Sequence, residues 1–316
     1  MIKNHHKLSN SEGLLLKETP KERRFQNQNQ HTAQANAVPL TTNMSHSNLS
    51  VIHPDAKIGK NVIIGPFTTI AADVEIGEGT WIASHVCIMD GARVGKNCKI
   101  FQGAIVGSSP QDLKYKGERT FLEIGDNTTI REYCTLNIGT TANWRTVIGK
   151  NCLIMAYAHV AHDCTIGNNV ILANNVTLAG HIDIGDYARL GGLTAVHQFV
   201  KIGNDVMVGG GSLVRSDVPP FITAAREPLS YAGVNRVGLR RHGYTAKQID
   251  NIRDVYRILF VQGYNLRQAV EHIKNTLPET TEKAIVLDFL SQSTRGLIKG
   301  YKTLNAKAVL KEVEED

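Results

Sequence analysis

Aromatic residues are scarce in this 316-residue chain, at 6% of the total, and no apolar stretch approaches the roughly 20 residues that cross a bilayer. We therefore expect no stable membrane insertion. The basic residues are dispersed and few aromatic side chains accompany them, which argues against a nucleic-acid partner. The formal net charge of +6 and the sequence pI of about 9.0 suit an acidic protein or a phosphorylated small molecule instead.

Cysteine is also sparse, and its spacing excludes the usual pairings. The five cysteines lie singly and form no CxxC pair: Cys87, Cys98, Cys134, Cys152 and Cys164. This arrangement is typical of small buried apolar residues rather than of disulfides or thiolate ligands. We predict free, buried cysteines and a reducing, cytoplasmic compartment.

Residues 1–49 lack hydrophobic periodicity and are rich in Asn, Gln and His. The tract Gln26–His31 has low complexity, so that we predict a disordered polar N-terminal extension. Leu14–Leu16 is too short for the apolar core of a secretory signal. An organelle transit peptide is an alternative, although several glutamates argue against it. A tag or an upstream extension is a further alternative.

Residues 50–218 carry a six-residue repeat. Read in steps of six from Ile52 to Val214, the chain places Ile, Leu or Val at 25 of 28 positions. Neither a helix nor a two-residue alternation gives a strict six, which is typical of a parallel β-helix. Gly, Asn and Asp often follow these positions and permit tight corners. Three strands and three corners make a coil of about 18 residues, so we predict about nine coils.

The repeat fails at three positions, Asp112, Glu118 and Ala142. These failures predict loops over Ser108–Phe121 and Thr140–Thr146. Loops on a rigid scaffold often carry binding residues, although a tolerated insertion explains the pattern equally well.

Residues 219–316 change to helical periodicity. Thr245 and Gln248 have the spacing of a capping box before a first helix. A second helix is predicted from Asn265, and a third over Glu282–Gln292. We therefore predict a small helical C-terminal domain over residues 219–316.

A step of one full coil along the chain aligns polar residues in a column. His162 aligns with Gly180 and then with Gln198, in strands spaced about 4.8 Å apart. His162 lies two places after the hexad residue Val160, so we expect its side chain to face outward. The adjoining column holds Asp163, His181 and Phe199.

This arrangement is typical of acyl transfer. Asp163 can orient His162, which can then deprotonate a hydroxyl, and the Gly180 amide can bind the oxyanion. No Ser or Cys beside His162 forms a nucleophile pattern, so direct attack by the acceptor hydroxyl is expected. His159 and His162 do not present both rings on one face of a coil, and we expect no metal. A chance alignment is the alternative at this point.

Several strings of the chain together resemble one family, the acyl-carrier-protein-dependent UDP-N-acetylglucosamine O-acyltransferases that begin lipid A synthesis. A lone six-residue repeat would indicate only the wider hexapeptide acyltransferase superfamily. The likeness covers about residues 44–300. The strings are His159–Cys164, Leu178–His181, Ala195–Phe199, Gln111–Tyr115, Gly233–Asn235 and Gly238–Arg241.

The resemblance implies an all-β left-handed parallel β-helix and a homotrimer with active sites in the clefts between neighbouring prisms. It also implies transfer of an (R)-3-hydroxyacyl chain from acyl carrier protein to the 3-hydroxyl of UDP-N-acetylglucosamine, without an acyl-enzyme. The donor's phosphopantetheine belongs to the carrier, and no further cofactor is expected. The basic helical domain is expected to receive the acidic carrier.

By the same resemblance, His162 is the general base, Asp163 its partner and Gly180 the oxyanion donor. Asn235 and Arg241 would hold the nucleotide end, and Gly210 would leave room for a long acyl chain. The remaining substrate contacts implied are Gln111, Asp112, Lys114, Asn137, His159, His181, His197 and Gln198.

Four positions depart from the family's pattern. His242 stands where a second Arg often follows Arg241, and Val237 stands where an acidic residue can occur. Asn137 and Ile138 replace a His-Arg or Asn-Arg pair. The contacts to the nucleotide are therefore less well supported by the sequence than the column through His162.

Three other functions are compatible with parts of this pattern. A related N-acyltransferase of the same pathway carries an extra domain before its coils, whereas here the additional folded domain follows them. An acetyl-CoA-dependent hexapeptide acetyltransferase would share the coils. A catalytically silent binding scaffold would share the fold alone.

Overall fold

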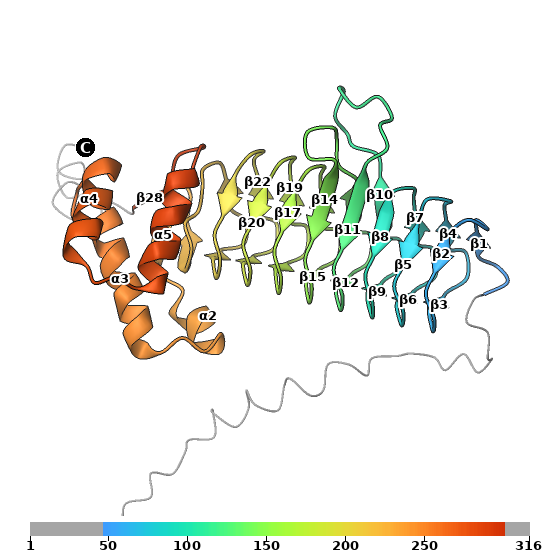
Figure 1. Ribbon diagram of the computed structural model, residues 1–316, viewed down its shortest axis with the longest axis horizontal. Helices are drawn as coiled ribbons and strands as arrows, with labels where there is room; N and C mark the ends of the chain where they lie inside the picture. Colours follow the sequence, from blue (N-terminus) through green and yellow to red (C-terminus); the bar gives the residue numbers. More distant parts are fainter. Residues whose placement is uncertain (1–46, 301–316) are drawn as a thin grey trace, which may run out of the picture. The chain divides into compact units, whose positions relative to one another are not determined.

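A computed structural model describes residues 47–300 of the chain (Figure 1). The described residues belong to one compact unit. The predicted disordered extension lies outside the described residues, apart from residues 47–49. None of the helices described between residues 47 and 300 is long and apolar enough to span a membrane.

Short strands stack into three parallel sheets, which form the sides of a prism (Figure 1). The first sheet consists of β1 (Val51–Ile52), β4 (Thr69–Ile70), β7 (Cys87–Ile88), β10 (Ile105–Ser108), β13 (Thr135–Asn137), β16 (His159–Val160), β19 (Thr177–Leu178), β22 (Ala195–Val196) and β25 (Leu213–Val214). The second sheet consists of β2 (Lys57–Ile58), β5 (Glu75–Ile76), β8 (Ala92–Val94), β11 (Phe121–Ile124), β14 (Arg145–Ile148), β17 (Thr165–Ile166), β20 (Asp183–Ile184) and β23 (Lys201–Ile202).

The third sheet extends beyond the repeat. Its members are β3 (Ile63–Ile64), β6 (Trp81–Ile82), β9 (Lys99–Ile100), β12 (Thr129–Ile130), β15 (Leu153–Ile154), β18 (Ile171–Leu172), β21 (Arg189–Leu190), β24 (Met207–Val208), β26 (Ile222–Ala225), β27 (Ser230–Val234) and β28 (Lys299–Gly300). β26 pairs in parallel with β24, and β27 pairs antiparallel to β26. The predicted left-handed parallel β-helix, followed by a helical region, is confirmed.

The interior of the prism is formed by the hexad residues. Of the 25 apolar hexad residues, 23 are buried, and the two half-buried ones are Ile52 and Ile58 in the first coil. Each buried Ile, Leu or Val contributes roughly 1.5–3 kcal/mol, which lets a stack of two-residue strands hold together. Four of the free cysteines are buried as predicted, but Cys87 is exposed because it points outward from β7 beside the hexad residue Ile88.

The corners of the coils fall into columns, here called edges. The site edge carries Asp163, His181 and Phe199, with φ of 59°, 60° and 66°. The asparagine edge, at a different corner of the prism, carries Asn151, Asn169, Tyr187 and Asp205, also with positive φ. Asn and Asp adopt this left-handed conformation at low cost, whereas His and Phe adopt it less readily. His181 and Phe199 at the corners of the site edge therefore require support from the surrounding coils.

Both predicted loops leave the prism at the site edge, between the first and second sheets (Figure 1). The first loop, residues 109–120, joins β10 to β11, and the second, residues 138–144, joins β13 to β14. Ile105 pairs with Thr135, and Thr135 pairs with His159. The first loop thus lengthens its coil by two hexads and the second by one hexad, which preserves the sixfold register. Arg145 and Thr146, predicted in the second loop, belong to β14.

Four helices are described after the coils: α2 (Arg236–Arg241), α3 (Ala246–Phe260), α4 (Leu266–Thr276) and α5 (Thr281–Gln292). The capping box of Thr245 and Gln248 is formed at the start of α3. The predicted division into domains at residue 218 stays a prediction. Strands β26 and β27 lie beyond it, where the amino-acid pattern carries no strand signal.

Candidate active site

The His162–Asp163 pair lies at the corner that follows β16. Val160 fills the interior, and the chain then turns through the left-handed Asp163, which directs His162 outward from the prism. His162 Nδ1 lies 2.8 Å from Asp163 Oδ2. A carboxylate can only accept, so Nδ1 donates this hydrogen bond and Nε2 is left with its lone pair. The side chain of Asp163 is fully buried, whereas that of His162 is 13% exposed.

The second loop fixes the Asp163 carboxylate. Thr140 donates to it from its backbone N (2.9 Å to Oδ1) and from its hydroxyl (2.6 Å to Oδ2). Burial disfavours the charge of Asp163, but the hydrogen bonds from Thr140 and His162 outweigh it and lower the pKa of the carboxyl. Asp163 is therefore ionised at neutral pH. Thr140 was missed from the sequence, and the only signal there was the broken register at Ala142.

Gly180 lies directly against the His162 ring. A Cβ added at residue 180 would be 2.6 Å from His162 Cε1 and 2.8 Å from Nε2, so any larger residue would displace the ring. Among residues 47–300, no acceptor bonds the Gly180 N–H. Val160, Leu178 and Val196 pair in register, which places His162, Gly180 and Gln198 in one column.

His181 and Phe199 support the same edge. The His181 ring packs edge-on against His162 at 5.0 Å and stacks on Phe199 at 4.6 Å. Burial lowers the pKa of His181; the Asp163 carboxylate opposes this effect, and the His162 ring adds to it. Asp112 and Lys114 also act on this pKa, which shows that the first loop faces the site edge.

His159 lies on β16, and its Nδ1 is 2.7 Å from Thr135 Oγ1. Burial, together with the charge of His162, lowers the pKa of His159. The imidazoles of His159 and His181 are therefore neutral at pH 7. Thr135 was not singled out from the sequence, because a threonine in a strand gives no signal of its own.

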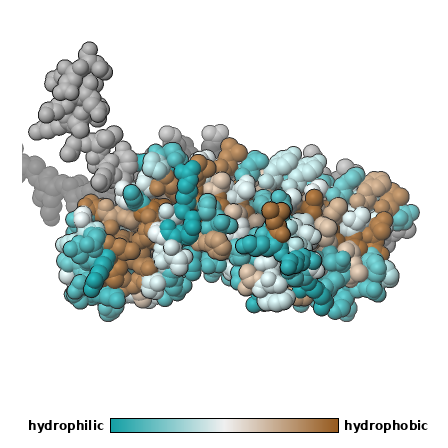
Figure 2. Space-filling model, turned by 90° about the horizontal axis from the view of Figure 1, so that it is seen from above, coloured by the Kyte–Doolittle hydropathy of each residue, from teal (hydrophilic) through white to brown (hydrophobic). Residues whose placement is uncertain are grey.

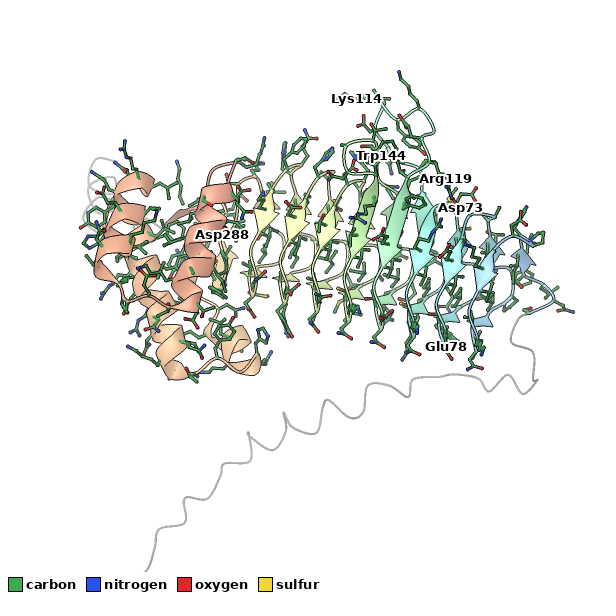
Figure 3. The ribbon with its side chains drawn as sticks, viewed as in Figure 1. Asp73, Glu78, Lys114, Arg119, Trp144 and Asp288 are labelled. Atoms are coloured by element: carbon green, nitrogen blue, oxygen red, sulfur yellow. The ribbon has the colours of Figure 1, made fainter. Side chains whose placement is uncertain are left out.

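The first loop carries Gln111, Asp112 and Lys114. The Lys114 N–H donates to Asp112 Oδ1 at 2.9 Å, which shapes a tight turn. Lys114 lies in the outer part of the loop, whereas Arg119 and Asp73 meet at its base, 2.9 Å apart (Figure 3). Gln111 is exposed. The loop is thus tied to the prism at its base, and it presents Lys114 to solvent at its outer end.

Asn137 is buried at the end of β13, under the first loop. Its Nδ2 donates to Ser108 Oγ at 2.7 Å and to the Ser109 carbonyl at 3.1 Å. Its Oδ1 has no partner within the described part of the chain. Asn137 therefore holds the start of the loop in this structure, and its substrate contact stays a prediction.

His197 and Gln198 are exposed one coil beyond Gly180. Gly210 lies beside the same part of the stack, where an added Cβ would be 3.1 Å from the Gly192 carbonyl oxygen. The neighbouring coil thus gives a packing reason for a small residue at position 210. Its effect on acyl-chain length stays a prediction.

Asn235 and Arg241 lie at the asparagine edge and not at the site edge. Asn235 caps α2 through the Gly238 N–H (3.0 Å) and donates to the Asp205 carbonyl (2.8 Å). At the end of α2, His242 Nδ1 lies 2.8 Å from Asp205 Oδ1 and its ring packs on Tyr187. Within one chain, the predicted nucleotide contacts and the His162 column therefore belong to different corners of the prism.

Within residues 47–300, one group of side chains has the spacing of a possible metal site. It consists of His162, Asp163 and His181, whose ligand atoms all lie within 4.8 Å of one another. Asp163 Oδ2 already accepts from His162 and Thr140, which occupies it without an ion. The expectation that no metal binds here stays a prediction.

Family models match two parts of this architecture. Residues 217–298 match the model described as "Udp N-acetylglucosamine O-acyltransferase; Domain 2", and residues 145–180 match "Bacterial transferase hexapeptide (six repeats)". The chain is 47% identical over 251 residues to the acyl-[acyl-carrier-protein]–UDP-N-acetylglucosamine O-acyltransferase of Alkalilimnicola ehrlichii. This match covers 79% of the present chain and 97% of that protein.

Solved structures agree with the sequence matches. LpxA from Acinetobacter baumannii has a TM-score of 0.79 and 43% identity, covering 81% of this chain and all of that one. LpxA of Bacteroides fragilis, described as a UDP-N-acetylglucosamine acyltransferase, has a TM-score of 0.79 and 44% identity, covering 80% of this chain and 99% of that one. The chain is an acyltransferase that belongs to the UDP-N-acetylglucosamine O-acyltransferase family.

Proposed function

We propose that the protein transfers an (R)-3-hydroxyacyl chain from acyl carrier protein to the 3-hydroxyl of UDP-N-acetylglucosamine, as the first step of lipid A synthesis in the cytoplasm. The names of its relatives support the donor and acceptor. One observation in the structure carries the chemistry. His162 has a free Nε2 next to Gly180, whose N–H has no acceptor within the described residues.

In the first step, His162 Nε2 accepts the proton of the sugar 3-hydroxyl while the hydroxyl oxygen bonds to the thioester carbon. General-base catalysis of this kind is worth roughly 10²–10⁴-fold in rate. The Nδ1–H bond to ionised Asp163 fixes the tautomer of the neutral ring, with the lone pair on Nε2, and stabilises the imidazolium that forms in the step. No residue of the protein becomes acylated.

In the second step, the tetrahedral intermediate collapses, the carbon–sulfur bond breaks, and the imidazolium returns its proton to the departing thiolate. The oxyanion of the intermediate accepts from the Gly180 N–H, a contact worth about 10²–10³-fold. A side chain at residue 180 would push the base away from this amide. The proximity of base and donor thus depends on one glycine.

The remaining residues of the site edge are proposed to hold the substrates. Lys114 and Asp112 in the first loop, together with Gln111 and Asn137, would close over the acceptor sugar. The neutral rings of His159 and His181, with His197 and Gln198, would line the path between sugar and thioester. Gly210 would leave space for a long acyl chain. No metal and no cofactor beyond the carrier's phosphopantetheine takes part in this scheme.

The two edges support the proposal of a homotrimer. Asn235 and Arg241 are proposed to hold the nucleotide, and Arg suits its phosphates. In one chain they lie at the asparagine edge, away from His162. A second copy that turns its asparagine edge toward the site edge of the first would complete the site, as closed cyclic assemblies permit.

The proposed reaction is tested by incubating the purified protein with UDP-N-acetylglucosamine and a pool of (R)-3-hydroxyacyl carrier proteins, with acetyl-CoA in a parallel reaction. We expect mass spectrometry to detect a 3-O-(3-hydroxyacyl) sugar nucleotide in the first reaction and no product in the second. Product from acetyl-CoA alone would contradict the proposal.

A further inference from the structure

A buried carboxylate holds the segment that follows α5 against the last coils. Asp217, fully buried, accepts through Oδ2 from Ser293 Oγ (2.7 Å), Thr294 N and Arg295 N (both 3.2 Å). Its Oδ1 accepts from the backbone N of Lys201 at 2.8 Å. Lys201 begins β23, directly after the last corner of the site edge, so this segment is fixed close to that edge. The position of the Arg295 backbone is therefore set by the coil itself.

The side chain of Arg295 reaches a residue of the site. Its guanidinium nitrogen lies 3.1 Å from Nδ1 of His197, which precedes Gln198 of the His162 column. Nδ1 is also 3.2 Å from the Gln198 carbonyl oxygen, and a neutral ring can serve only one of these contacts. A guanidinium only donates, so the bond to Arg295 leaves the His197 proton on Nε2 as an outward-facing donor.

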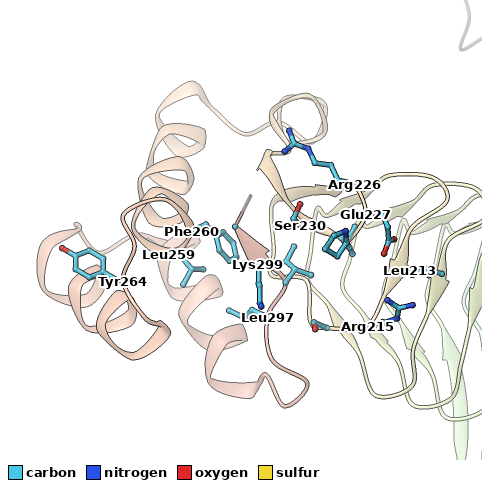
Figure 4. A pocket seen from close by; sticks show the side chains of 15 residues that line it. Leu213, Arg215, Arg226, Glu227, Ser230, Leu259, Phe260, Tyr264, Leu297 and Lys299 are labelled. Carbon is cyan, nitrogen blue, oxygen red and sulfur yellow. The ribbon is translucent and has the colours of Figure 1, made fainter. Parts of the chain in front are cut away.

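A second arginine lies next to the same histidine. Val196 pairs in register with Val214, which places Arg215 beside His197 on the next coil. Arg215 also lines a cavity of about 670 Å³ between the last coil and the helices, together with Glu227 and Lys299 (Figure 4). Among residues 47–300, no carboxylate lies within 4.0 Å of the guanidinium of Arg215 or of Arg295.

We propose that Arg215, Arg295 and His197 form a phosphate-binding site for the phosphodiester of the donor's phosphopantetheine arm. Guanidinium groups bind phosphate oxygens through paired hydrogen bonds, and this group holds two that lack a carboxylate. His197 lies two and Arg215 three strand spacings of about 4.8 Å from the coil of His162, roughly 10 to 14 Å, a distance that an extended arm spans to place its thioester at Gly180. This inference rests on the proposed function, because it requires a carrier-borne donor.

The donor and the acceptor of the proposed reaction each carry phosphate, and the geometry favours the donor's phosphodiester as the ligand of Arg215 and Arg295. The diphosphate of the acceptor is assigned to Arg241 at the asparagine edge, whereas Arg215 and Arg295 lie at the end of the site edge nearest the helical region. Figure 2 shows hydrophobic residues gathered among polar ones over that region, a mixed surface suited to a carrier protein.

The test compares two carrier-free donors, 3-hydroxyacyl-phosphopantetheine and its dephosphorylated form, at saturating UDP-N-acetylglucosamine. We expect the wild type to favour the phosphorylated donor by about tenfold or more in kcat/KM, the size of effect of a hydrogen bond to a charged group. Arg295→Ala and Arg215→Ala should each reduce this preference several-fold and leave the KM of the sugar nucleotide unchanged. Arg267→Ala, which removes an exposed arginine of α4, is the matched control and should keep the preference.

The inference is overturned if the arginine variants lower kcat/KM for both donors equally, or if they raise the KM of the sugar nucleotide while the donor preference persists. The second result would assign the site to the acceptor's diphosphate. Thermal unfolding of each variant identifies one that has lost its fold, and Arg295→Lys then replaces Arg295→Ala as the test. Wild-type transfer from intact acyl carrier protein establishes the proposed function separately, and its absence would remove both proposals.

Discussion

The site edge and the asparagine edge of the prism have the same left-handed corners, but they differ in whether the backbone N–H before the corner is hydrogen-bonded. At the asparagine edge, the backbone N–H groups before three successive corners are each bonded by a side chain one coil later. Asn168 Oδ1 accepts from Lys150 N, Asp186 Oδ1 from Asn168 N, and Asn204 Oδ1 from Asp186 N, at 2.6–3.0 Å. These bonds form a ladder that satisfies the backbone along the edge.

At the site edge the equivalent ladder is broken. The residue one coil after His162 is Gly180, which has no side chain, and the residue one coil after Gly180 is Gln198, which does not bond the Gly180 N–H in the described structure. A buried N–H without a partner costs free energy, so a fold keeps one where it has a use. In the proposed mechanism, the amide that binds the oxyanion therefore results from the absence of a capping side chain, without any change of the backbone.

Removing the base should give the largest effect. His162→Ala eliminates the acceptor for the hydroxyl proton, and we expect kcat to fall roughly 10²–10⁴-fold. His85→Ala removes an exposed histidine at a different corner of the prism and should keep wild-type activity. Steady-state kinetics with both substrates measure this difference. Turnover of His162→Ala within about threefold of the wild type would show that another group is the base.

Restoring the ladder at the site edge should give the next largest effect. At the asparagine edge, Asn204 accepts from the Asp186 N–H one coil earlier. Position 198 stands in the same relation to Gly180. Gln198→Asn should therefore bond the Gly180 N–H and withdraw it from the oxyanion. We expect kcat to fall about 10²-fold, the value of one oxyanion donor. Gln198→Ala removes the carboxamide without capping the amide and should lose less. Equal losses in the two variants would mean that Gln198 acts only by contacting substrate.

Acidification should protonate the half-buried imidazole of His181 at the site edge and destabilise the fold. The pKa of His181 in the folded protein lies below its ordinary value of 6.5, so the unfolded chain binds this proton more readily. The contribution of the neutral His181 ring to the free energy of unfolding is complete above about pH 6.5. It is lost as the pH falls through the pKa of His181 in the folded protein. His181→Asn should therefore flatten the decrease in melting temperature below pH 6.5, and His85→Asn should not. Identical pH profiles for the wild type and His181→Asn would refute this prediction.

A break in the asparagine ladder should have the smallest effect. Asp186→Ala leaves the Asn168 N–H without its acceptor, which costs about 1 kcal/mol of unfolding free energy, or a few degrees in melting temperature. Transfer activity should be unchanged, because Asp186 is not among the residues proposed to bind substrate. Calorimetry and the transfer assay on one preparation test both parts. A large loss of activity with intact stability would mean that this part of the edge also contacts substrate.

Periodicity made the coils and the His162 column predictable, because register follows from counting whole coils and a corner directs the next side chain outward. For the two loops, only their positions were predictable, from the interruptions of the hexad repeat. Thr140 supports Asp163 from a loop that has no repeat, so nothing in the sequence linked the two residues. The burial of Asn137 could not be predicted either, since it depends on how the first loop folds back over β13. The inserts add two hexads and one hexad, which explains why the hexad register survives both loops.

The most direct test of the account is whether the two edges act together across a boundary between copies. His162→Ala impairs only the site edge and Arg241→Ala only the asparagine edge. In the proposed homotrimer, co-expression of the two variants in equal amounts would give mixed trimers, each of which contains one site built from two unaltered edges. We expect the mixture to recover about a quarter of wild-type transfer activity, well above the sum of the separate variants. Activity no higher than that sum would contradict a site shared between copies.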